Sequence, residues 1–69
     1  MEKERQLAIL KNIAQSLEDN LEAALLNARI CGKVADERGL EAAKKQAAEF
    51  EKKLEKAREI EAELTEKKE

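Results

Sequence analysis

The 69-residue chain lacks proline, histidine, tryptophan and tyrosine, and it has one cysteine, one phenylalanine and two glycines. A single cysteine cannot form a disulfide within the chain. Metals that prefer nitrogen or sulfur ligands, zinc above all, find almost no ligands here. Phe50 alone offers no platform on which nucleic-acid bases could stack. We therefore expect no disulfide scaffold and no cofactor.

An excess of charge of one sign is also missing. The chain has 14 basic and 16 acidic residues, for a net charge of −2, which gives no electrostatic footprint for nucleic acid. No apolar run approaches the ~20 residues of a membrane span. The mixed charges of residues 1–5 do not fit a signal peptide. These features predict a cytoplasmic protein that binds neither nucleic acid nor membrane.

Helix-forming residues dominate what is present, because Glu, Ala, Lys, Leu and Arg make up most of the chain. In the first half, apolar residues recur at spacings of three and four, which is typical of a heptad repeat. This heptad seam consists of Leu7, Leu10, Ala14, Leu17, Leu21, Ala24, Ala28, Cys31 and Ala35. It predicts a first helix over about residues 3–38.

The second half carries one narrower apolar stripe on a highly charged background. Its members are Leu40, Ala43, Ala47, Phe50, Leu54, Ala57, Ile60 or its neighbour Glu61, and Leu64. A straight helix would place Ile60 inside and leave Glu61 at the margin. The stripe predicts a second helix over about residues 41–67, with one buried side.

The turn between these helices is predicted near Gly39, as the residue after a helix end, with Leu40 folding back on the last turn. Gly32 is the rival boundary. A further turn at Asn20 would give three helices, but the heptad seam runs through Asn20 without a break. The sequence thus predicts an all-α fold of two long antiparallel helices.

The first helix is too apolar for its partner to cover. Between residues 6 and 35 there are 17 apolar and six charged residues, so apolar side chains extend beyond one stripe. Ile9, Ile13, Ile30 and Val34 widen the apolar face on one flank, and Leu25 and Leu26 on the other. An uncovered apolar surface normally marks an interface. We expect self-association into a helical bundle, most simply as a dimer.

The expected function is a structural self-assembling module without catalytic activity. Its predicted interface comprises Leu7, Leu10, Ile13, Leu17, Leu21, Leu25, Ile30 and Val34. The alternative is a binding module whose first helix docks a helix or peptide of another protein. No small-molecule ligand is predicted.

Few polar residues are candidates for a binding or catalytic role. Asn20 and Asn27 lie one heptad apart, on a stripe shared with Ser16, Ile13 and Val34. They can edge the interface in contact with water, set its register when buried, or line a polar cavity. Cys31 lies in the heptad seam without a histidine to activate it, and we interpret it as a core residue.

The segment from Gly39-Leu40-Glu41-Ala42-Ala43-Lys44-Lys45 through Glu49-Phe50-Glu51-Lys52-Lys53-Leu54-Glu55-Lys56-Ala57 resembles computationally designed helical bundles. Such proteins favour idealised Ala, Glu, Lys and Leu surfaces. The resemblance covers about half of the chain and is one of style. The first helix departs from it, since Asn12, Gln15 and Gly32 are less idealised.

Overall fold

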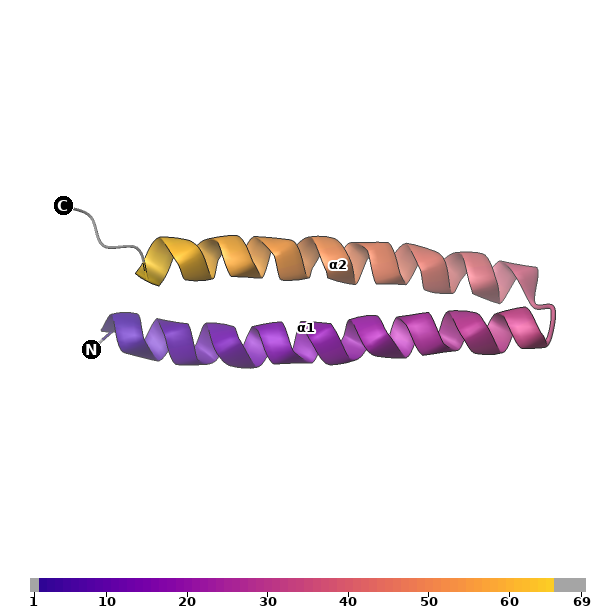
Figure 1. Cartoon of the computed structure of the whole chain (residues 1–69), viewed down its shortest axis with the longest axis horizontal. Coiled ribbons are helices and arrows are strands. Elements are labelled where there is room, and N and C mark those ends of the chain that lie inside the picture. The colour runs from indigo at the N-terminus through magenta and orange to yellow at the C-terminus, as the bar shows by residue number, and fades with distance from the viewer. Residues whose placement is uncertain (1, 66–69) are drawn as a thin grey trace.

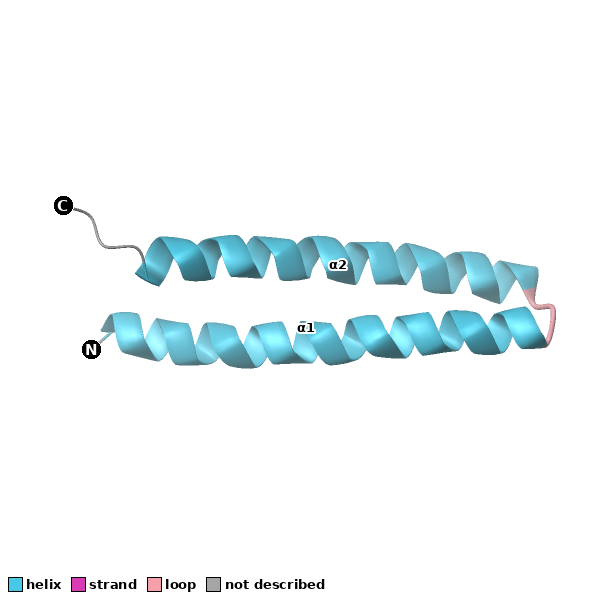
Figure 2. Ribbon diagram, viewed as in Figure 1, coloured by secondary structure: helices cyan, strands magenta, loops and turns pink. Residues whose placement is uncertain are grey.

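The computed structural model describes residues 2–65, which form two antiparallel helices joined by a short turn (Figures 1 and 2). Helix α1 spans Glu2–Lys33 and helix α2 spans Glu37–Thr65. The start of α1 and the end of α2 lie at the same end of the molecule (Figure 1). The predicted all-α hairpin is confirmed, while the predicted extension of the second helix to residue 67 lies outside the described residues.

The two helices contact each other along the predicted heptad positions. Each heptad-seam residue from Leu7 to Cys31 is buried or half-buried, and so is the α2 stripe at Leu40, Ala43, Ala47, Phe50, Leu54, Ala57 and Leu64. At the disputed position Glu61 is half-buried, whereas Ile60 is 46% exposed. The expectation for Ile60 was therefore wrong, because the 3.5-residue repeat persists to the end of α2.

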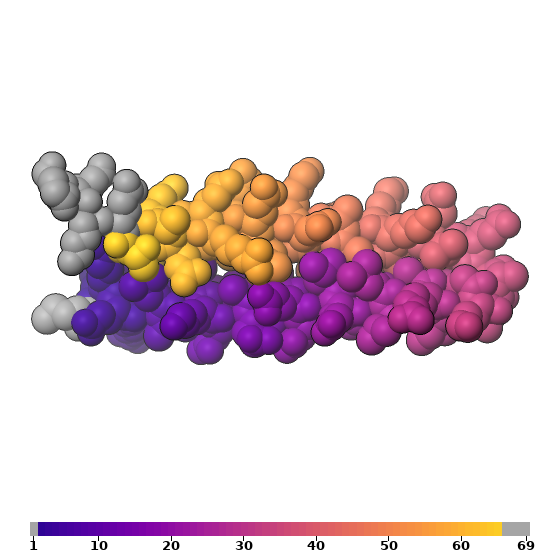
Figure 3. Space-filling model, in the orientation of Figure 1, coloured from indigo at the N-terminus to yellow at the C-terminus, as the bar shows by residue number. Residues whose placement is uncertain are grey.

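The hairpin is a single layer, with principal extents of 54 × 18 × 11 Å (Figure 3). Its buried apolar residues are Ala24, Cys31, Ala43, Ala47, Leu54 and Ala57. Among residues 2–65 Leu54 is the only large side chain in this set. Two helices side by side can enclose only the line along which they touch, so both broad faces of the layer remain open.

The turn lies at residues 34–36 and not at Gly39, which belongs to the first turn of α2. The Ala35 amide donates to the Gly32 carbonyl at 3.3 Å, and the Asp36 amide donates to the Cys31 carbonyl at 2.8 Å. This bond pair defines a Schellman motif, in which the residue after the helix end is left-handed. That residue is Ala35, with φ of 59°.

Asp36 also begins the next helix. Its Oδ1 accepts a hydrogen bond from the Gly39 amide at 3.0 Å, as an N-cap residue does. One residue thus ends the C-cap motif of α1 and caps α2, which makes the connection very short. The sequence prediction placed the turn near Gly39 because glycine is common after helix ends. This prediction was wrong, since an alanine occupies the left-handed position.

Replacing Ala35 with glycine is expected to stabilise the hairpin. A left-handed alanine costs about 1–2 kcal/mol, and the greater entropy of glycine in the unfolded chain offsets about half of that gain. We expect the free energy of unfolding to rise by about 0.5–1 kcal/mol. Urea unfolding followed by circular dichroism would measure it, and an unchanged or lower midpoint would contradict the left-handed assignment.

The two glycines should respond oppositely to alanine. A Cβ atom at Gly39 would lie 2.8 Å from the Cys31 Sγ and 2.5 Å from the Asp36 Oδ2, whereas one at Gly32 would meet nothing within 4 Å. Gly39→Ala should therefore lower the free energy of unfolding by about 1 kcal/mol or more through overpacking. Gly32→Ala should raise it by about 0.5 kcal/mol through helix propensity. The same urea titration tests both, and equal effects would contradict the close approach at Gly39.

Candidate association surface

A second row of residues runs along α1 beside the heptad seam, again at spacings of three and four. We call it the outer stripe, and it consists of Ile9, Ile13, Ser16, Asn20, Ala23, Asn27, Ile30 and, just past the end of α1, Val34. Its centre lies about 100° around the helix from the centre of the heptad seam. All eight residues are exposed.

The ends of the outer stripe are strongly apolar. Ile9 and Ile13 near the start of α1 are 50% and 47% exposed, and Ile30 and Val34 near the turn are 61% and 68% exposed. Its middle is polar, with Ser16, Asn20 and Asn27. Large aliphatic side chains thus flank a short polar segment on one side of one helix.

An open groove separates the middle of the outer stripe from α2. Its lining residues are Asn20, Ala23, Ala24, Leu26, Asn27, Ile30, Gln46 and Phe50. Asn20 and Asn27 are both exposed in the hairpin. They therefore lie on a surface groove and do not line an internal cavity.

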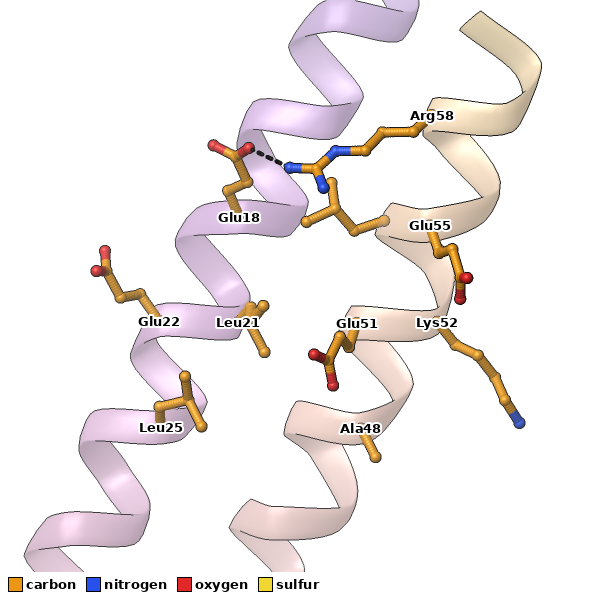
Figure 4. Close-up of a pocket in the computed structure, with 10 residues that line it drawn as sticks. Glu18, Leu21, Glu22, Leu25, Ala48, Glu51, Lys52, Glu55 and Arg58 are labelled. Atoms are coloured by element: carbon orange, nitrogen blue, oxygen red, sulfur yellow. Dashed lines mark hydrogen bonds and ion pairs between the residues drawn. The ribbon is translucent and has the colours of Figure 1, made fainter. Parts of the chain in front are cut away.

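The opposite face of the hairpin carries a charged groove (Figure 4). Four carboxylates line it, at Glu18, Glu22, Glu51 and Glu55, together with Leu21, Leu25, Ala48, Lys52, Leu54 and Arg58. Arg58 reaches from α2 to α1, where its Nη2 lies 3.2 Å from the Glu18 Oε2 (Figure 4). Both side chains are about half exposed or more, so the pair contributes at most about 1 kcal/mol. The two faces of the layer thus differ in chemistry.

The structure divides the predicted interface residues into three groups. Leu7, Leu10, Leu17 and Leu21 are half-buried members of the heptad seam, so they pack on α2 within the chain. Ile13, Ile30 and Val34 lie in the outer stripe, and Ile9 joins them.

Leu25 lines the charged groove on the other face. Leu26, expected beside Leu25, lines the groove of the outer stripe instead.

Cys31 is 8% exposed and lies against Gly39. Within residues 2–65, no group of three or more His, Cys, Asp or Glu side chains is placed to hold a metal ion. In the same range, neither helix is long and apolar enough to cross a membrane. Comparisons of the chain with protein-family models, curated proteins and solved structures found no match.

Proposed function

We propose that the hairpin is a structural self-assembly module without catalytic activity, and that the outer stripe of α1 is its interface. One observation carries this proposal. Four large aliphatic side chains, at Ile9, Ile13, Ile30 and Val34, are aligned on one side of α1 and about half exposed or more. Helix α2 occupies the heptad seam and leaves this side uncovered.

The exposed area supports association. The hairpin exposes 5872 Å², whereas a compact monomer of its 7.8 kDa mass would expose about 4400 Å². The excess of about 1500 Å² is larger than the ~800 Å² that each partner contributes to a standard interface. Burying the remaining half of each large aliphatic side chain would contribute about 1 kcal/mol apiece.

A closed symmetric dimer is the simplest assembly that uses this surface. Two hairpins stacked face to face form a four-helix bundle, in which the heptad seam of each hairpin and the outer stripe together surround one core. The small core of the single hairpin is typical of a chain that gains stability by oligomerisation.

Sedimentation equilibrium of the unmodified chain, at micromolar concentration and neutral pH, tests this function. We expect a mass that is twice the 7.8 kDa of the monomer, and a shift toward monomer on dilution. A monomer at every concentration would contradict self-assembly. If that monomer also bound an apolar dye strongly, the surface would instead suit a helix from another protein.

A further inference from the structure

We infer that two copies pair through their outer stripes in an antiparallel arrangement, with a two-fold axis perpendicular to the helices at Leu21 and Glu22. This inference rests on the proposed function and specifies the partner surface and its register. Two features of the chain carry it: the order of residues in the outer stripe, and the difference between the two helices in apolar content.

The outer stripe reads alike in both directions. Reversal about the point between Leu21 and Glu22 brings each large aliphatic member opposite another large aliphatic member. The four pairs between copies are Ile9 with Val34, Ile13 with Ile30, Ser16 with Asn27, and Asn20 with Ala23. Every large aliphatic residue therefore meets another, at both ends of the interface.

Antiparallel registers shifted by one heptad lose this match. A shift by one heptad places Ile9 opposite Asn27, or Ile30 opposite Asn20. Each such pair would bury an amide against an aliphatic side chain without a hydrogen-bond partner, which is costly. The aliphatic ends of the outer stripe thus favour this register over those shifted by one heptad.

The same axis determines how the two α2 helices meet. Cys31 lies against Gly39, so in the antiparallel hairpin the axis crosses α2 close to Glu49. A perpendicular two-fold axis that pairs α1 with α1 also brings the two α2 helices side by side.

The competing ways of stacking two hairpins are less favourable. A two-fold axis parallel to the helices would place α1 of one copy on α2 of the other, and the apolar ends of the outer stripe would then cover the highly charged surface of α2. A parallel contact of α1 with α1 would leave the two α2 helices on opposite sides, outside the bundle. The antiparallel arrangement alone covers the outer stripe and joins all four helices.

Spin-label distances test the arrangement directly. Ala8 and Glu22 occupy the same heptad position two heptads apart, and both are exposed away from the outer stripe. Each is replaced in turn by cysteine in a Cys31→Ala background and labelled, so that every chain carries one label. In the antiparallel dimer the two Ala8→Cys labels are separated along the bundle by about 40 Å, and the two Glu22→Cys labels by about 2 Å. Double electron–electron resonance measures both distances.

The outcomes separate the register from the function. A much longer distance at position 8 than at position 22, in a sample that sediments as a dimer, supports the inference. Equal distances in a dimer would show parallel pairing and overturn the register while leaving self-assembly intact. A sample that sediments as a monomer, both labelled and as the unmodified chain, would overturn the proposed function and the register together. Circular dichroism of the labelled variants checks that they remain helical.

Discussion

Replacing Ile13 and Ile30 together with lysine is expected to dissociate the assembly into monomers. In the proposed dimer Ile13 of each copy contacts Ile30 of the other, which gives two such contacts. The double variant places two lysines in each contact, and therefore four ammonium groups in the interface. Buried charges without partners are strongly destabilising. Even a cost of about 1 kcal/mol for each substitution would total about 4 kcal/mol and weaken the dimer roughly 1000-fold.

The matched control is Leu25→Lys. Leu25 is 50% exposed, much like Ile13, but it lies on the opposite face among Glu22, Glu51 and Glu55. A lysine there gains carboxylate neighbours and leaves the outer stripe intact. Sedimentation equilibrium should therefore give a monomer for the double variant and a dimer for the control. The reverse result would move the interface to the charged face, and two unchanged dimers would exclude the outer stripe.

The contact between the helices was predictable because it depends on spacing alone. Apolar residues at intervals of three and four return to one side of a helix, whatever their size. The heptad seam was therefore correct through Cys31, and α1 continues through Asn20 without a turn. The error at Ile60 came from the assumption of a straight helix. The 3.6-residue repeat of such a helix drifts away from the heptad positions and would have turned Ile60 toward α1.

The turn could not be located from its most conspicuous residue. Gly39 is required for a different reason, since Cys31 and the capping Asp36 occupy the space that its side chain would take. The residue that adopts the left-handed conformation is Ala35, for which the sequence offers no signal. Asp36 was the available signal, because aspartate commonly begins a helix.

The association surface was only partly predictable. The excess of apolar residues on the first helix and its two flanks were visible in the sequence, but the predicted interface combined residues from both flanks and from the heptad seam. Four of the predicted interface residues turned out to pack within the hairpin, and Leu25 faces away from Ile13.

The second large effect is expected at Leu54, where replacement by alanine should lower the free energy of unfolding by about 2–4 kcal/mol. Leu54 is 6% exposed and is the only large buried side chain among residues 2–65. The other buried residues are alanines and one cysteine, which cannot shift far enough to fill the space. Chemical unfolding at fixed protein concentration would measure the loss, because unfolding of a dimer depends on concentration.

Leu25→Ala is the control, since it is also a replacement of leucine by alanine and removes the same side-chain atoms. Leu25 is half exposed and already in contact with water, so its truncation leaves no cavity and should cost less than about 1 kcal/mol. Both leucines line the charged groove, which makes burial the main difference between them. Equal losses would mean that Leu54 is not enclosed between the helices. A large loss at Leu54 alone would show that this side chain is enclosed between the helices and stabilises their contact.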